Sequence, residues 1–190
     1  MTSSVPLVAA VVVMATAATL AAPQVPRVAR DLDGVSYQLT KPAPGDVHLL
    51  VFIGAECPIS NRYAPEIARI ASEYSPRHVR TFLIYADDGI DAMRARAHQA
   101  EFYAAVHLPV VIDPAGEWLA ATGTTITPQA VIYTPAGRVY RGRIDDWYET
   151  ISRNRRVPTV RDVRRSLDAV LAGRPVPVAE TQAIGCYVAR

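Results

Sequence analysis

The stretch FIGAECPISNRYAPEI, Phe52 to Ile67, contains one of the two cysteines of this 190-residue sequence. It continues an apolar run that starts at Val47 and is typical of a buried strand. From Ser60 to Tyr74, apolar residues recur at helical spacing. Cys57 therefore lies where a strand leads into a helix. Unpaired N–H groups and the helix dipole stabilise an anion there, which favours the reactive thiolate form of a cysteine.

Strands and helices alternate along the rest of the chain. Apolar runs and turn residues predict strands at 36–40, 47–54, 79–87, 108–113, 128–134 and 137–145. Helical spacing and capping residues predict helices at 60–74, 90–106, 117–123 and 160–172. Thr159 is expected to cap the last helix. This order predicts an α/β sandwich around a mixed sheet.

The first residues differ from the remainder in composition. Residues 5–22 are rich in Ala and Val and end in small residues, so residues 1–22 are expected to be a secretory signal peptide. Thr19 and Ala21 fit the positions before the cleavage site. The MTSS start has no Lys or Arg, and an uncleaved membrane anchor at 5–22 is the alternative. An exported protein, periplasmic or extracellular, is expected.

The charge of the chain and its two cysteines limit the other classes of function. A net charge of +2 is too small to indicate nucleic-acid binding. The one basic cluster, residues 153–165, is expected to be a solvated helix face. Residues 174–190 form a Pro-punctuated tail that is expected to be irregular and that carries Cys186. In an exported chain two cysteines can form a redox pair, form a structural disulfide or stay separate, and all three stay open.

Two motifs resemble known proteins. Cys57-Pro58-Ile59-Ser60, followed by Ala64-Pro65, resembles the thioredoxin-fold active site, where Cys-x-x-Cys opens the first long helix and a proline lies eight residues after the first cysteine. TITPQAVIY, with Thr127-Pro128, resembles the Thr-Pro element of that superfamily, whose cis-proline packs beside the reactive cysteine. The run from DPAGEWLAATG to YRGRID and the closing ETQAIGC resemble exported bacterial redoxins, the AhpC/TSA-like, peroxiredoxin-related branch.

The resemblance covers residues 34–144. It implies a thioredoxin-like sandwich, with a central mixed sheet flanked by helices, as a single domain at 34–173. It also implies thiol–disulfide oxidoreductase activity on protein or small-molecule thiols and disulfides, with no cofactor. Oligomeric state does not follow from it.

One departure from the motif concerns the second cysteine. Ser60 replaces it, so exchange within the motif is excluded. Cys186 is then the candidate resolving thiol, attacking a mixed disulfide or sulfenic acid on Cys57. A permanent disulfide is the alternative, and closing a loop of about 130 residues would stabilise the fold by roughly 5 kcal/mol. The expected site comprises Cys57 as nucleophile, Cys186 as resolving thiol, Ser60 as hydrogen-bond donor to the sulfur, Pro128 as cis-proline, and Pro58 and Thr127 as substrate-binding residues.

Two other functions are alternatives. Peroxiredoxins carry Thr three residues and Pro seven residues before the reactive cysteine, whereas this chain has Gly54 and Leu50, which speaks against efficient peroxide reduction. A non-catalytic binding module, holding copper or a partner, is the other. The four histidines show no ligand-like spacing, and no metal is expected. His98, in an Arg-rich helix, is expected at the surface.

Overall fold

The computed structural model describes residues 28–188. A five-stranded sheet forms its centre, in the order β5-β4-β3-β7-β8. Its strands are β3 (Val47–Ile53), β4 (Val79–Tyr85), β5 (Val110–Ile112), β7 (Gln129–Thr134) and β8 (Gly137–Gly142). The pairs β3–β4 and β4–β5 are parallel, whereas β3–β7 and β7–β8 are antiparallel. The predicted mixed sheet is therefore confirmed.

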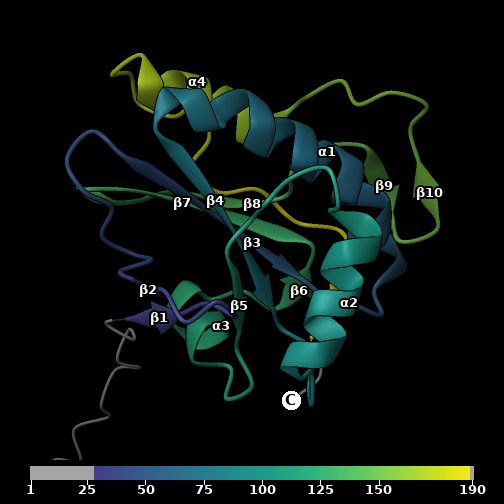
Figure 1. Cartoon of the computed structure of the whole chain (residues 1–190). Coiled ribbons are helices and arrows are strands. Elements are labelled where there is room, and N and C mark those ends of the chain that lie inside the picture. The colour runs from purple at the N-terminus through teal and green to yellow at the C-terminus, as the bar shows by residue number, and fades with distance from the viewer. Residues whose placement is uncertain (1–27, 189–190) are drawn as a thin grey trace, which may run out of the picture.

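The helices cover both faces of this sheet. They are α1 (Pro58–Tyr74), α2 (Ala92–Phe102), α3 (Glu117–Thr122) and α4 (Asp162–Leu171), with a 3₁₀ turn at Ser75–Arg77. Figure 1 shows α1 and α4 above the sheet and α3 below it. This is the thioredoxin-like α/β sandwich that the sequence predicted. The expected signal peptide or anchor at 1–22 lies outside the described residues; within residues 28–188, no helix is long and apolar enough to cross a membrane.

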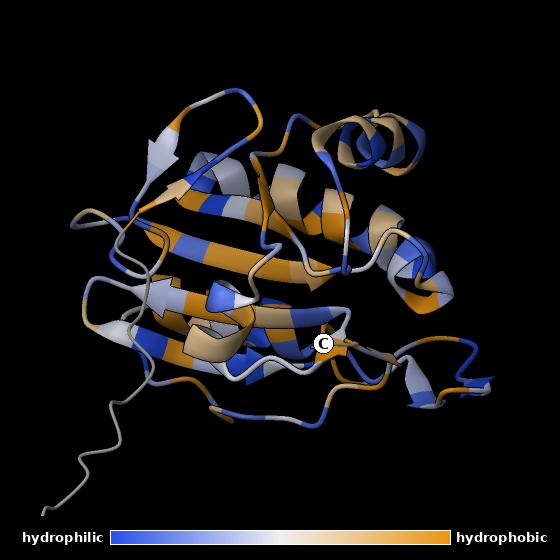
Figure 2. Cartoon of the chain, turned by 90° about the horizontal axis from the view of Figure 1, so that it is seen from below, coloured by the Kyte–Doolittle hydropathy of each residue, from blue (hydrophilic) through white to orange (hydrophobic). Residues whose placement is uncertain are grey.

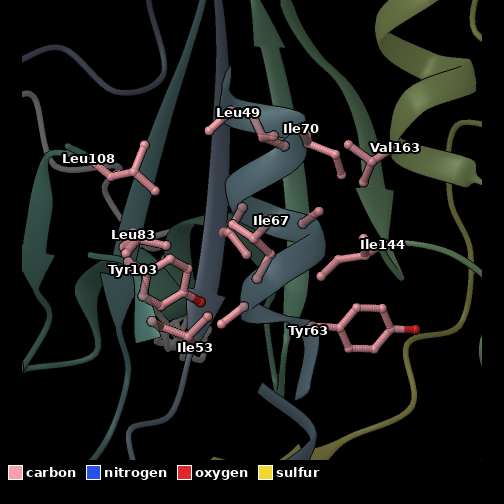
Figure 3. Close-up of a cluster of buried hydrophobic side chains, with 14 of the residues drawn as sticks. Leu49, Ile53, Tyr63, Ile67, Ile70, Leu83, Tyr103, Leu108, Ile144 and Val163 are labelled. Carbon is pink, nitrogen blue, oxygen red and sulfur yellow. The ribbon is translucent and has the colours of Figure 1, made fainter. Parts of the chain in front are cut away.

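Alternating side chains of the central strands divide the core into two layers. Leu49, Val51 and Ile53 face α1 and pack on its apolar stripe, which includes Ile67 (Figure 3). Leu50 and Phe52 point to the opposite face, where Trp118 of α3 packs. Figure 2 shows the central strands as apolar along much of their length, as expected for strands buried on both faces.

Three small ladders surround the sheet. They pair β1 (Ala29–Arg30) with β2 (Ser36–Tyr37), β9 (Tyr148–Thr150) with β10 (Arg153–Asn154), and β6 (Ile126–Thr127) with β11 (Cys186–Tyr187). The strand expected at 36–40 is thus only two residues long. The tail expected to be irregular contains β11, which places Cys186 beside the residues that precede Pro128.

The expected cap of the last helix is wrong. Arg161, not Thr159, occupies the N-cap position of α4, and its side chain makes no capping bond. Thr159 instead donates its N–H to Asp146 Oδ1 at 2.7 Å, and its hydroxyl contacts the same carboxylate. The buried Asp146 therefore takes the Thr159 hydroxyl that local spacing assigned to the helix.

Candidate redox site

Cys57 is the N-cap residue of α1, as the sequence predicted. Its backbone is extended, with φ −84° and ψ 110°, and Pro58 follows in the first turn. Proline suits this position because its missing N–H would have had no partner in the helix. The Ser60 N–H points at Cys57 Sγ over 3.5 Å. The sulfur therefore lies at the positive end of the helix dipole, where a thiolate is stabilised.

The Ser60 side chain was expected to donate a hydrogen bond to the sulfur, but the donor is the backbone N–H of Ser60. Ser60 Oγ accepts from the Gly54 N–H at 3.3 Å, and no hydrogen bond in the described chain joins this oxygen to Cys57. The hydroxyl thus ties the end of β3 to the first turn of α1. A catalytic role for Ser60 stays a prediction.

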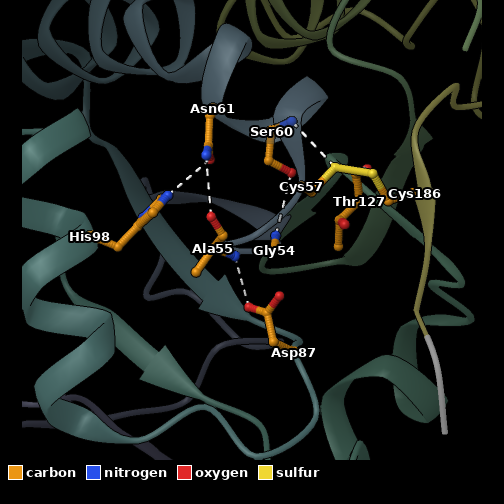
Figure 4. Close-up of a disulfide and its surroundings, with 9 residues drawn as sticks. All are labelled: Gly54, Ala55, Cys57, Ser60, Asn61, Asp87, His98, Thr127 and Cys186. Atoms are coloured by element: carbon orange, nitrogen blue, oxygen red, sulfur yellow. Dashed lines mark hydrogen bonds between the residues drawn. A yellow bond between two sulfur atoms is a disulfide. The ribbon is translucent and has the colours of Figure 1, made fainter.

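Cys57 and Cys186 are joined by a disulfide (Figure 4). Their Cα atoms lie 6.1 Å apart although 129 positions separate them in the chain. Cys57 is only 4% exposed, and Cys186 is partly exposed on β11. The sequence left the pairing of the two cysteines open. In the structure they form one pair, whose buried member lies at the start of the helix.

The Thr127-Pro128 peptide bond is cis and lies next to the disulfide. Cys57 Sγ lies 3.2 Å from the Thr127 carbonyl oxygen. In the disulfide this sulfur has no proton, so it can donate to that oxygen only as a reduced thiol. Cys186 is opposite Thr127 in the antiparallel β6–β11 pairing. The structure thus brings Cys57, Pro58, Ser60, Thr127, Pro128 and Cys186 together.

A buried polar network that the sequence did not reveal supports the loop before Cys57. His98 of α2 is 7% exposed, so its expected surface position is wrong. Its Nδ1 lies 2.7 Å from the Tyr85 hydroxyl and its Nε2 lies 2.9 Å from Asn61 Oδ1. Asn61 Nδ2 donates to the carbonyl of Ala55, two residues before Cys57. Burial lowers the pKa of His98, which favours the neutral ring.

Asp87 holds the other side of the same loop. Its Oδ2 accepts from the Ala55 N–H at 2.8 Å (Figure 4). A Cβ atom at Gly54 would lie 2.9 Å from Asp87 Oδ1 and 3.2 Å from Thr127 Oγ1. The threonine that peroxiredoxins carry at this position therefore does not fit without movement of these neighbours. In the sequence, Asp87 is the last residue of the strand predicted at 79–87, and nothing else indicated its role.

The disulfide borders a cavity of about 340 Å³. Both cysteines line it, together with Thr127, Tyr187 and Val188 from the adjoining strands. Glu56, Asp87, Asp88 and Arg94 form much of the remaining wall. A group that reaches the two sulfurs through this cavity would therefore contact residues of the β6–β11 strand pair.

The C-terminal tail is anchored upstream of Cys186. The Arg141 N–H donates to Ala179 O and the Thr181 N–H donates to Arg141 O, so the tail extends the sheet at β8. Thr181 Oγ1 also lies 2.6 Å from the Tyr140 hydroxyl and accepts from the Arg143 N–H at 3.1 Å. Arg141 contacts Glu180, and Arg143 pairs with Asp162.

Metal ligands are not gathered anywhere in residues 28–188. No group of three or more His, Cys, Asp or Glu side chains there is placed to hold a metal ion. The described site therefore offers no support for the copper-binding alternative.

Several solved structures share the fold. An uncharacterised conserved protein from Geobacillus kaustophilus is 26% identical, with a TM-score of 0.74 over 88% of this chain and 90% of that one. A hypothetical protein from Sinorhizobium meliloti is 24% identical, with a TM-score of 0.70 over 85% and 88% of the two chains. A secreted Mycobacterium tuberculosis disulfide oxidoreductase, homologous to E. coli DsbE, is 17% identical, with a TM-score of 0.52 over 77% and 94%.

The sequence comparisons identify the family. No curated protein matches the chain. The Redoxin family model matches residues 17–139, which span the strand before Cys57, helix α1 and the cis-proline element. The chain belongs to the redoxin family of the thioredoxin fold.

Proposed function

We propose that the protein is a thiol–disulfide oxidoreductase whose redox centre is the Cys57–Cys186 pair. One observation carries this proposal: the sulfur at the start of α1 is bonded to a cysteine on a two-residue strand at the cavity. Helix-terminal thiolates are good nucleophiles and good leaving groups. The strand that carries Cys186 is only two residues long, so few ladder pairs hold it on β6.

The chemistry proceeds by two thiol–disulfide exchanges. In the reduced protein, the Cys57 thiolate attacks one sulfur of a substrate disulfide, which forms a mixed disulfide and releases the other substrate sulfur as a thiolate. The Cys186 thiolate then attacks Cys57 Sγ and releases the second substrate thiolate. The substrate gains two electrons and two protons, and the protein becomes the disulfide seen here. The reverse sequence oxidises a substrate dithiol.

The surroundings support these roles. The Ser60 N–H faces the Cys57 sulfur, and the Thr127 carbonyl lies where a reduced thiol could donate its proton. The secreted disulfide oxidoreductase from Mycobacterium tuberculosis shares the fold and suggests protein thiols and disulfides as substrates. Because that protein is secreted, it also favours export of this chain. We propose residues 1–22 as the signal peptide, which mass measurement of the mature N-terminus would test.

Single-cysteine variants test the proposal. Wild-type protein should oxidise a dithiol peptide in glutathione buffer faster than the uncatalysed reaction, and Cys57→Ser should abolish this rate increase. Cys186→Ser should instead accumulate a mixed disulfide on Cys57, detected by peptide mass mapping, because no internal thiol resolves it. If Cys57→Ser is as active as wild type, the proposal is wrong.

A structural disulfide is the competing reading. The anchored tail favours it, since backbone bonds that do not involve the sulfurs hold Ala179 and Thr181 on β8. Under that reading the pair resists reduction until the protein unfolds. The two readings therefore differ in the potential at which the native pair opens.

A further inference from the structure

The residue before Cys186 lies against the cis-proline strand. A Cβ atom on Gly185 would lie 2.7 Å from the Thr127 carbonyl carbon, nearer still to its oxygen, and 3.0 Å from Ile126 Cγ2. Real Cβ atoms are essentially never this close to backbone, so a larger residue requires one of the two strands to move. The φ of Gly185 is not in the left-handed region, so the close approach alone demands glycine.

The residues after Cys186 alternate in exposure. Tyr187 points into solvent and is 82% exposed, whereas Val188 is partly buried against the cluster that contains Phe52 and Trp118. The Val188 N–H donates to the Thr125 carbonyl at 3.0 Å, which continues the pairing of β11 with β6. Recognition of this segment therefore depends on its backbone, a glycine, a cysteine and one apolar side chain.

A substrate must take the place of this segment. With Cys57 in its present conformation, a substrate sulfur bonded to it would take the position of Cys186 Sγ, and Cys57 is 4% exposed with the tail in place. The backbone bonds at Ala179 and Thr181 hold the tail on β8, so residues 182–188 are the part that would have to leave β6 in the reduced protein. The free edge of β6 and the cavity beside it then admit an extended chain.

On the basis of the proposed function, we infer that the protein acts on extended polypeptide segments of the pattern Gly-Cys-x-apolar, which pair with β6 in the register of β11. The segment at 185–188 is the internal copy of this substrate. Tail and substrate exclude each other, so the return of Cys186 resolves the mixed disulfide and also expels the substrate from β6.

Peptide exchange kinetics test this inference. Cys57 of the Cys186→Ser variant is first loaded with 5-thio-2-nitrobenzoate, and release of the coloured thiol is followed with the thiol peptides AIGCYV, AIVCYV and AIGCSV. Because a Cβ atom on the residue before the cysteine would overlap the Thr127 backbone, AIGCYV should react about fivefold or more faster than AIVCYV. AIGCSV should equal AIGCYV, since Tyr187 is exposed. The rate of each peptide with a small-molecule disulfide corrects for the intrinsic reactivity of its thiol, and 2-mercaptoethanol reports how readily the loaded Cys57 reacts with a thiol that cannot pair with β6.

The outcomes separate the two proposals. Equal rates for AIGCYV and AIVCYV would overturn the glycine preference and leave the proposed function standing. Release with none of the thiols would contradict both. In the full chain, Gly185→Ala should slow closure of the Cys57–Cys186 bond about tenfold, whereas Gln182→Ala, an exposed position of the same segment, should not. Equal closure by both variants would also overturn the inference.

Discussion

The buried His98 provides a quantitative test of how the loop before Cys57 is held. In His98→Phe, the aromatic ring can still stack on Phe102, whose ring centroid lies 4.6 Å from that of His98, but both ring nitrogens are lost. The Tyr85 hydroxyl, on a fully buried side chain, then has no acceptor. Asn61 is partly exposed, so water can replace its contact.

An unsatisfied buried hydroxyl costs about 1–3 kcal/mol, so His98→Phe should lower the free energy of unfolding by that amount. Removing both partners leaves no orphan group. The double variant Tyr85→Phe/His98→Phe should therefore recover most of the loss. His107→Phe is the control, because the His107 side chain is 87% exposed and should change stability by less than about 0.5 kcal/mol.

Urea denaturation followed by circular dichroism measures all four proteins. A double variant that is no more stable than His98→Phe would refute the reasoning, because the hydroxyl would then not be the source of the cost. Unchanged stability in His98→Phe would show that the Tyr85–His98–Asn61 chain does not hold the loop.

Three further predictions concern the pH dependence of stability and the C-terminal tail. Burial lowers the pKa of His98, so as the pH falls this histidine takes up a proton in the unfolded chain before it does in the folded one. The stability of the wild type should therefore drop from about pH 6.5 downward, and the stability of His98→Phe should drop less. Urea midpoints at pH 7 and pH 5 measure both. Burial opposes ionisation of Glu66, but Arg164 and Arg69 outweigh this effect and lower its pKa. Glu66→Gln should lower the free energy of unfolding by about 1–3 kcal/mol at pH 7, and the difference from wild type should vanish as the pH falls through the lowered pKa. A difference that stays constant with pH would contradict the ion-pair account. Thr181→Val removes the bonds to Tyr140 and Arg143 and should speed amide exchange at residues 182–188 and slow disulfide closure, whereas Thr150→Val, at an exposed position, should do neither.

Local patterns in the sequence were sufficient for much of the fold. The apolar run at 47–54 and the helical spacing after it placed Cys57 at the start of a helix because both signals are local. The resemblance around Thr127-Pro128 predicted the cis bond, which the structure contains. The strand and the helix start depend on neighbours within a few residues along the chain, whereas the cis bond was predicted from the resemblance alone.

The remaining features depend on distant contacts. The arginines of α2 indicated a surface helix, but His98 on this helix contacts Tyr85 of β4 and Asn61 of α1, which periodicity in this short helix does not reveal. Prolines in the tail indicated irregular structure, whereas the β8 edge and β6 pair with it. Thr159, which was expected to cap the last helix, bonds instead to Asp146, thirteen residues earlier. Pairing partners of this kind are not visible in one sequence.

The reduction potential of the native Cys57–Cys186 pair tests the central claim most directly. Folded protein is equilibrated in thiol–disulfide buffers of set potential, free thiols are alkylated, and peptide mass mapping reports the state of each cysteine. An exchange-active pair should open in the folded protein between about −270 and −120 mV, the range of known oxidoreductases. A pair that stays closed below about −300 mV, or that opens only when the protein unfolds, would be a structural disulfide and would contradict the account.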